Sequence, residues 1–460
     1  MAAENDLGRD DIKKLVVRIA IPSMLAQFVS VLYSIVDRMY IGNIADVGDI
    51  ALAGVGICGP IVTMISAFAA WIGNGGAPLL SIKSGEQNKE GASAILANCF
   101  VLLIGMAVCL TIGAYLCKDA LLVWFGATER IFPYAETYMR IYLIGTVFAV
   151  LSLGLNQFII CQGFSNLGMV SVIIGAVLNI VLDPVFIFAL HMGVAGAAVA
   201  TVLSQMASCA FVLSFLFGKK VPVKISFGGY DRKLIQRILL VGFTPFIIIA
   251  VDNVMIISMN SVLQTYGGPG EGDMLITCAT IAQSYLLLIT SPMIGISGGT
   301  QAILSYNYGA RCVNRVKDAE RNILGVMLIF TTIMFLLSRF IPRYFVLLFT
   351  TDPQYIRFSV WSIRTYTLMI IPLSFQYVFV DGLTALECPK TGLALSVTRK
   401  SLFVISAAVL PSFFGAKAAF FAEPVADGIS SVLSTVVFLL LINRHLDKRC
   451  RMDKKVFHRV

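Results

Sequence analysis

The sequence predicts an all-α polytopic membrane protein, with twelve transmembrane helices in two pseudo-symmetric six-helix lobes around a central cavity. Of its 460 residues, 58% are hydrophobic and only 13% are charged, whereas soluble domains have about 25% charged residues. Apolar runs of about 20 residues, enough for a helix to cross a bilayer, recur along the whole chain. These runs lack the alternation of apolar and polar residues that is typical of transmembrane strands.

The apolar runs and the turn residues between them set the expected order of the helices. The expected ranges are 14–41, 51–80, 92–116, 136–160, 168–190, 194–217, 236–263, 275–304, 321–348, 357–384, 392–415 and 417–442. The first run contains Asp37 and has no small-residue cleavage site after it. We therefore expect it to be a transmembrane helix and not a removed signal peptide.

Basic residues predict the orientation of the chain in the membrane. Lys and Arg gather after the sixth helix, after the eighth helix and in the tail, whereas the loop 264–273 has acids and neither Lys nor Arg. The positive-inside rule then places both termini in the cytoplasm of a multi-pass protein of the cell inner (plasma) membrane. This also explains the net charge of +9, so that we expect the lipid bilayer and no nucleic acid as a partner. The expected parts are an N-terminal lobe, a cytoplasmic linker, a C-terminal lobe and a basic cytoplasmic tail, at 1–217, 218–235, 236–442 and 443–460.

Cysteine and histidine usage argues against a metal centre or an enzyme. The ten cysteines are scattered, mostly within apolar runs, and form no CxxC pair, so they are expected to be small buried hydrophobic residues. The three histidines, His191, His445 and His458, lie in a loop and in the tail. We expect no cofactor apart from a coupling ion and no enzymatic activity.

The two halves of the chain resemble each other in sequence. Glycines and a serine near the end of the second helix recur 224 positions later near the end of the eighth: Gly75, Ser81 and Gly85 correspond to Gly299, Ser305 and Gly309. Six helices return the chain to the same side of the membrane, so the duplication is parallel. Such halves enclose a cavity and rock about it in membrane transporters.

Two acids lie within apolar runs of the first half, at Asp37 and Asp183. A carboxylate inside the membrane is costly and is a functional-site hypothesis by default. Asn179 lies four residues before Asp183 and shares its helix face, and Thr201 lies at a similar depth, roughly 10–12 Å below the outer boundary. These four residues supply two carboxylates, an amide oxygen and a hydroxyl, a set suited to Na⁺, while the repelling acids could carry H⁺. The alternative is a hydrogen-bonded pair that only ties the helices together.

The duplicated half does not repeat this set. Asp37 aligns with Asn260, and Asp183 aligns with Ile405. The predicted ion site therefore belongs to the first half alone. Tyr33, four residues before Asp37 and on the same helix face, is a candidate contact for a bound substrate.

The second half has its own charged residues. Asp252, in the middle of the seventh helix, could neutralise a cationic substrate or bond to a neighbouring helix. Glu423 could face the cavity of the second lobe or its wetted mouth. Asp381 is expected at the cytoplasmic interface, and Arg399 and Lys400 are expected to extend toward the cytoplasmic surface.

Four segments resemble motifs of the multidrug and toxic compound extrusion (MATE) transporters, and the resemblance extends over essentially the whole chain. They are Val36–Gly42, Asn179–Pro184, Gly295–Ala310 and Ala422–Asp427. The bacterial DinF/MepA-like branch is the most similar. The resemblance implies two six-helix lobes, alternating access, and export of organic cations driven by Na⁺ or H⁺.

The family's cation site carries over onto Asp37, Asn179, Asp183 and Thr201, and a further polar position of the family matches Asn156. We therefore expect a monomeric secondary antiporter that exports organic, mostly cationic, drugs or toxic metabolites in exchange for Na⁺ or H⁺. Two other functions remain open. A flippase for a lipid-linked precursor would need a cavity rich in Arg and Lys, and an integral-membrane enzyme would need an intramembrane His or a Ser/His/Asp set.

Overall fold

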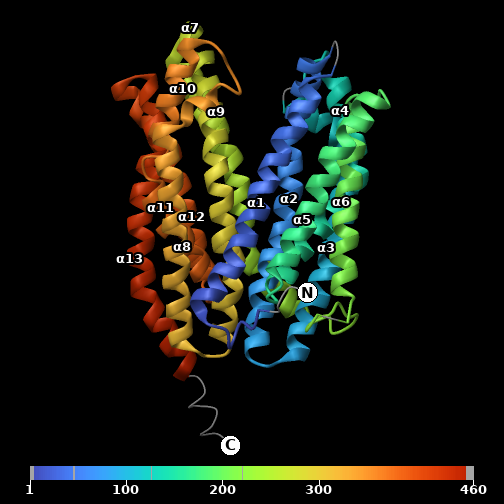
Figure 1. Ribbon diagram of the computed structural model, residues 1–460, viewed down its shortest axis with the longest axis vertical. Coiled ribbons are helices and arrows are strands. Elements are labelled where there is room, and N and C mark those ends of the chain that lie inside the picture. Colours follow the sequence, from blue (N-terminus) through green and yellow to red (C-terminus); the bar gives the residue numbers. More distant parts are fainter. Residues whose placement is uncertain (1–4, 45–46, 126, 220, 452–460) are drawn as a thin grey trace, which may run out of the picture. The chain divides into compact units, whose positions relative to one another are not determined.

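The computed structural model describes residues 5–44, 47–125, 127–219 and 221–451, which are helical almost throughout and contain no strand. The helices are α1 (Ile12–Gly42), α2 (Gly48–Gly85), α3 (Lys89–Trp124), α4 (Phe132–Ile160), α5 (Ser165–Pro184), the π-helical η1 (Val185–Ala189), α6 (Val194–Leu216), α7 (Arg232–Gly309), α8 (Val313–Phe340), α9 (Pro342–Val346), α10 (Pro353–Tyr366), α11 (Ile370–Ala385), α12 (Pro389–Phe414), the 3₁₀ helix η2 (Ala416–Phe421) and α13 (Ala422–Arg451). Figure 1 shows their course. The tail predicted at 443–460 begins as part of α13, and residues 452–460 lie outside the described part.

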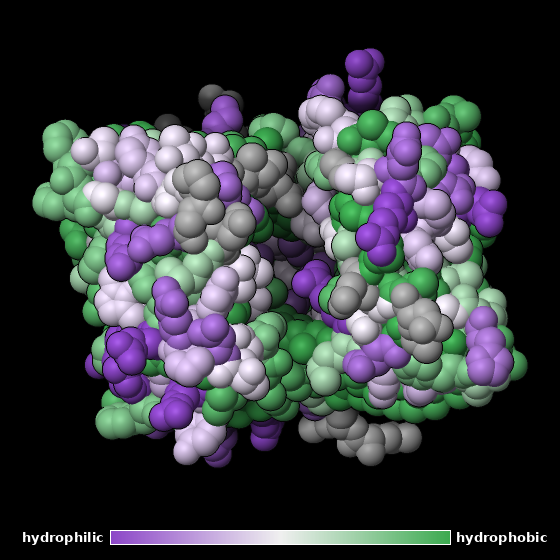
Figure 2. Space-filling model, turned by 90° about the horizontal axis from the view of Figure 1, so that it is seen from above, coloured by the Kyte–Doolittle hydropathy of each residue, from purple (hydrophilic) through white to green (hydrophobic). Residues whose placement is uncertain are grey.

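The predicted fold class is confirmed. Within the described residues, eleven helices are long and apolar enough to cross a membrane, or twelve if α10 and α11 form one span bent by 46°. Helix α7 contains two of these spans, Arg232–Gly268 and Met274–Gly309. They are separated at Gly268, whose φ of 63° is readily adopted only by glycine. In the view from above, hydrophilic residues lie on the near face and hydrophobic residues lie along its outer edge (Figure 2), as expected where helix sides face lipid.

Two predicted helices differ from the structure for identifiable reasons. The ninth was expected at 321–348, but α8 begins at Val313 and ends at Phe340. Its first turns carry many charged residues, which hydropathy excludes from a span, and its end precedes Pro342, since the residue before a proline disfavours helical geometry. The tenth was expected as one helix at 357–384 but is divided between α10 and α11.

The chain forms two compact units. Unit 1 comprises Met1–Leu7 and Leu25–Ile249, and unit 2 comprises Gly8–Met24 and Ala250–Val460. The chain therefore passes from one unit to the other three times: between Leu7 and Gly8, within α1, and within α7. In α1 this passage lies three residues after Pro22, which has no N–H for the helical ladder.

The duplication is visible in the backbone of the two units. Non-helical residues with positive φ recur at matching positions, 224 or 222 residues apart: Gln87 and Arg311, Gly163 and Glu387, Gly193 and Gly415. A buried contact recurs as well. Ser81 Oγ donates to the carbonyl of Cys161 at 3.0 Å, and Ser305 Oγ donates to the carbonyl of Ala385 at 3.1 Å.

Within unit 1, α2 and the first part of α7 approach each other backbone to backbone. A Cβ on Gly75 would meet the carbonyl of Ile238 and would lie 3.0 Å from the Cα of Gly242, and a Cβ on Gly242 would meet the carbonyl of Trp71. The Trp71 indole N–H donates to the carbonyl of Leu239 at 2.7 Å. Glycine is needed at this crossing because the two helices cannot move apart to make room for a Cβ without breaking the hydrogen bond from Trp71 to Leu239.

We expect Gly75→Ala to destabilise the purified protein by about 1–3 kcal/mol, the usual cost of overpacking. The matched control is Gly59→Ala on the same helix, where an added Cβ meets nothing within 4 Å. Thermal unfolding in detergent measures both variants. Equal midpoints for the two would contradict the close crossing.

Candidate functional site

The acids that the sequence singled out come together in unit 1. Asp37 on α1 and Asp183 on α5 place their carboxyl groups next to each other, so that the two groups interact directly. Asp183 has no exposed surface, and Asn179, one turn earlier on α5, is 3% exposed. Thr201 on α6 completes this set, the Asp37 group, which consists of Asp37, Asn179, Asp183 and Thr201. The structure thus brings Asp37 next to residues of two further helices that lie more than 140 positions later in the chain.

A short chain of hydrogen bonds orders the amide and the hydroxyl of this group. Asn179 Nδ2 donates to Asp183 Oδ1 at 3.3 Å and to Thr201 Oγ1 at 3.4 Å. Thr201 Oγ1 in turn donates to the carbonyl of Ala197 at 2.9 Å. The amide nitrogen is therefore committed to its neighbours, which leaves the amide oxygen free to face another ligand.

Three oxygens of this group are buried and have no hydrogen-bond partner in the described structure. They are Asp37 Oδ1, Asn179 Oδ1 and Asp183 Oδ2. An unsatisfied buried acceptor costs about 1–3 kcal/mol, and more when it is charged. A small cation bound among them would be coordinated by all three oxygens. Alternatively, a proton on one carboxyl group would let that group donate a hydrogen bond to the other. The arrangement is therefore chemically suited to binding and releasing Na⁺ or H⁺.

Local backbone features hold Asp183 in place. Pro184 follows it and has no N–H, so that the regular helical ladder ends there, and the chain continues as the π-helical turn Val185–Ala189. Such turns are frequent at functional sites. Gly196 at the start of α6 packs directly on this turn, because a Cβ there would lie 2.7 Å from the carbonyl of Phe186. This contact fixes α6, and with it Thr201, beside α5.

Two tyrosines and a glutamine that the sequence did not suggest border the site. Tyr138 on α4 lies beside Thr201 and Asp37. It stacks on Tyr142 with ring centroids 6.1 Å apart, and Tyr142 lies beside Gln205 on α6. Gln205 Oε1 is another buried oxygen without a partner. The spacing of these residues gave no signal, since they lie on helices whose pairing with α1 the sequence does not reveal.

The other candidates of the first half fall into two positions. Tyr33 lies near Asp37, one turn earlier on α1. Asn156 lies further away, because its Oδ1 accepts a hydrogen bond at 3.0 Å from Ser171, which precedes Asn179 on α5 by eight residues, or about 12 Å. Asn156 therefore joins α4 to α5 and is not part of the Asp37 group.

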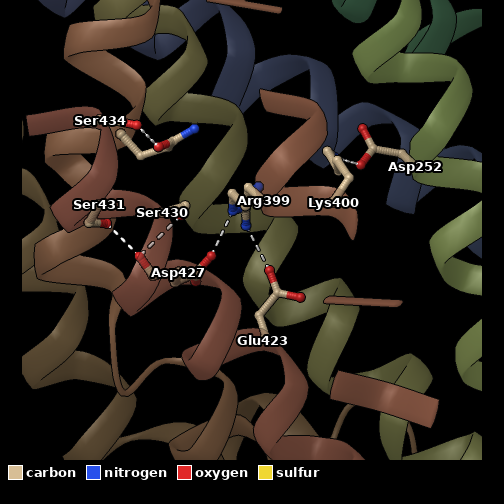
Figure 3. A network of polar contacts seen from close by, with 9 residues as sticks. Asp252, Arg399, Lys400, Glu423, Asp427, Ser430, Ser431 and Ser434 are labelled. Carbon is tan, nitrogen blue, oxygen red and sulfur yellow. Dashed lines mark hydrogen bonds and ion pairs between the residues drawn. The ribbon is translucent and has the colours of Figure 1, made fainter. Parts of the chain in front are cut away.

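Unit 2 holds a different charged network, drawn in Figure 3. Arg399 on α12 donates from Nε to Asp427 Oδ1 at 2.7 Å and from Nη2 to Glu423 Oε1 at 2.8 Å. The three side chains are 10%, 0% and 8% exposed respectively. One guanidinium thus ties together two acids from successive turns of α13.

The neighbouring Lys400 forms an ion pair with Asp252 on α7 (Figure 3). Its side chain is only 8% exposed, whereas that of Asp252 is 48% exposed. The expectation that Arg399 and Lys400 extend to the cytoplasmic surface is therefore wrong. Both are buried because three acids, contributed by α7 and α13, neutralise them at depth.

A family model and curated relatives match the chain. The model for the MatE family matches residues 22–185 and 248–410, that is, one copy in each half. The multidrug export protein MepA of Staphylococcus haemolyticus is 21% identical over 435 residues, which is 94% of this chain and 94% of the relative. The FAD transporter of Shewanella oneidensis is 23% identical over 431 residues, which is 90% of this chain and 92% of the relative.

Solved structures share the fold over the whole chain. The outward-facing conformation of a multidrug resistance MATE family transporter of the MOP superfamily has a TM-score of 0.90 and 25% identity, covering 96% of this chain and 98% of that one. A MOP superfamily transporter from Pyrococcus furiosus, described as having a binding pocket of reverse polarity, has a TM-score of 0.89 and 25% identity, covering 95% and 98%. The two-lobe architecture and the resemblance to MATE transporters are thereby confirmed.

Proposed function

Because the chain belongs to the MatE family of membrane transporters, we propose that it is a secondary active antiporter that exports organic cations in exchange for Na⁺ or H⁺. The observation that carries this proposal is the group of buried, unpartnered oxygens on Asp37, Asn179 and Asp183. Without a cation, these buried and unsatisfied oxygens destabilise the protein, and a bound cation removes that penalty. Cation binding can therefore shift the equilibrium between two conformations of the transporter.

The proposed cycle follows from that bias. From outside, a cation enters between Asp37 and Asp183 and removes the cost of two adjacent carboxylates in a poorly solvated place. The free energy released favours the conformation in which substrate leaves to the outside. A ligand shifts such an equilibrium only by its differential affinity for the two states. The protein, now without substrate but with the cation bound, turns inward, releases the cation to the cytoplasm and binds the next substrate.

Charge supports organic cations as the substrate class. The Asp37 group has two acids with one basic neighbour, Arg38, which forms no ion pair with them among the described residues. The network of unit 2 has three acids and two bases. The MepA relative is named as a multidrug exporter, which agrees with this choice. A lipid-linked pyrophosphate would need free basic groups, whereas Arg399 and Lys400 are already paired. The relative named as an FAD transporter makes a flavin dinucleotide the appropriate anionic competitor in a test.

The topology belongs to the same proposal. We place the protein in the cell inner membrane as a monomer, with lobes at 1–217 and 236–442 and with both termini in the cytoplasm. The Lys and Arg residues after α6, around the start of α8 and at the end of α13 support this orientation.

Proteoliposomes loaded with a fluorescent organic cation test the function. An inward gradient of either Na⁺ or H⁺, imposed separately, is expected to accelerate efflux of the dye severalfold over vesicles with no gradient, because only the coupling ion relieves the Asp37 group. Unlabelled flavin dinucleotide is expected to leave the rate unchanged. If neither the Na⁺ gradient nor the H⁺ gradient makes dye efflux faster than in vesicles with no gradient, coupled antiport is refuted.

A further inference from the structure

Glu320 on α8 is a buried acid that the proposed exchange does not use. It is 5% exposed, and neither of its carboxylate oxygens has a hydrogen-bond partner in the described structure. The charged residues around it in the same turns, Lys317, Asp318 and Arg321, are exposed. Glu320 therefore faces the interior of unit 2 although it lies in the most hydrophilic part of its helix.

The Glu320 carboxyl group lies against α11, beside a second acid. A Cβ on Gly382 would be 3.1 Å from its carboxyl carbon, so the carboxyl group packs directly on the α11 backbone next to Asp381, with which it interacts electrostatically. Ser297 and Gln301, on the second span of α7, lie at the Asp381 carboxyl group. Two acids and two neutral polar side chains from three helices thus meet in one place.

The charged surroundings of this pair are sparse. No Lys, Arg or His pairs with Glu320 or Asp381 among the described residues. A further titratable neighbour is Tyr377, one turn before Asp381 on α11, which also lies near the Arg399 network. The two acids therefore have each other, Ser297 and Gln301 as polar neighbours, and no neutralising cation.

The repeat shows that helix packing does not require these acids. Subtracting 224 residues from Ser297, Gln301, Glu320 and Asp381 gives Gly73, Ala77, Leu96 and Gln157. Unit 1 packs the equivalent helices with none of the titratable groups, and the serine-to-carbonyl contact near this place is the same in both units. The acids thus occur in unit 2 alone, and unit 1 packs its equivalent helices without them.

We propose that Glu320 and Asp381 form a proton-binding site, separate from the Asp37 group. It exchanges its proton at the end of unit 2 where α8 begins. A buried carboxylate without a donor is far more costly than the neutral acid, and one proton turns an unsatisfied acceptor of Glu320 into a donor toward its polar neighbours. A proton suits the site because it supplies the donor that the two unpartnered Glu320 oxygens lack.

The route for the proton is short. Glu320 lies seven residues after Val313, the first residue of α8, so about 10 Å of helix separates it from the helix end. The basic residues near this end predict that it faces the cytoplasm. The site is separate from the exchange at Asp37, and the protein binds this proton whether or not it exports organic cations.

Infrared spectroscopy of the full-length protein in lipid nanodiscs tests the site without transport. A buried neutral carboxyl group gives a distinct C=O stretching band at neutral pH. We expect the wild-type spectrum to contain one such band that is missing from the spectra of Glu320→Gln and Glu320→Leu. The leucine is the residue found at the equivalent position of unit 1, Leu96. Asp318→Asn, two residues away on the exposed side of α8, is expected to keep it, and so is Asp37→Asn.

A second pair of variants keeps the charge and moves only the carboxyl group. Gly382→Ala places a methyl group against Glu320 and is expected to shift the band, whereas Gly325→Ala on α8, with nothing within 4 Å of the added Cβ, is expected to leave it in place. The proposal is overturned if the spectra of Glu320→Gln and the wild type coincide at neutral pH. It is equally overturned if the band disappears on addition of Na⁺ at constant pH, since the site would then hold Na⁺.

Discussion

Asp37→Asn is expected to abolish gradient-driven export of an organic cation, with a loss of about tenfold or more in the accelerated efflux rate, the usual size of a coupling between two binding sites. The side chain keeps its shape and its helix, but one of the two adjacent carboxylates disappears. The remaining Asp183 no longer carries a like charge beside it, so the cation that relieved their repulsion has little to gain by binding. Downhill leakage of the dye without a gradient is expected to continue.

The matched control is Asp119→Asn in the same unit. Its side chain is 64% exposed and pairs with Lys118 at 2.7 Å, and Lys118 keeps a second partner in Glu136 at 2.8 Å. Exposed pairs of this kind contribute little, so export is expected to remain at the wild-type rate. If Asp37→Asn exports as fast as this control under the same gradient, Asp37 does not carry the coupling ion.

Arg399→Met is expected to produce the largest loss of stability in unit 2, about 3–5 kcal/mol. The change leaves Glu423 and Asp427 buried without the guanidinium that holds both, and Asp427 has no exposed surface. An uncompensated buried charge costs more than the ion pair contributed. The thermal unfolding midpoint of the purified protein, followed by intrinsic fluorescence, measures the effect.

A triple variant separates charge from packing at this position. Arg399→Met combined with Glu423→Gln and Asp427→Asn removes the uncompensated charges while keeping similar side-chain volumes. We expect it to recover most of the lost stability. A triple variant as unstable as Arg399→Met alone would mean that Arg399 stabilises unit 2 by packing and not by neutralising the two acids.

The fold was largely predictable because hydropathy and repetition act over many residues. Runs of apolar residues located the helices, and the glycine and serine pairs 224 positions apart revealed the duplication that recurs in the positive-φ residues. The breaks were less predictable. Hydropathy averages over a window, so it did not reveal the bend between α10 and α11, which lies within one apolar stretch. It also placed the start of α8 too late, because the charged first turns after Val313 lower the mean hydropathy there.

The site was predictable where a polar residue interrupts an apolar run. Asp37, Asn179, Asp183 and Thr201 each do so, and the structure places them together. Glu320 does not stand out, because it lies among exposed charges at the start of α8 and only tertiary packing buries it. Burial likewise decides the environment of Arg399, since its acid partners lie on α13 and the sequence does not show which helix faces α12.

Simultaneous measurement of drug and ion movement tests the central claim most directly. Proteoliposomes loaded with an organic cation allow its efflux to be followed together with the entry of radioactive Na⁺ or of protons reported by a trapped pH-sensitive dye. The account predicts that one of the two ions enters in fixed proportion to the drug that leaves, and that Asp183→Asn abolishes this entry. Uphill export of the drug with no entry of either ion, or unaltered ion entry in Asp183→Asn, would contradict it.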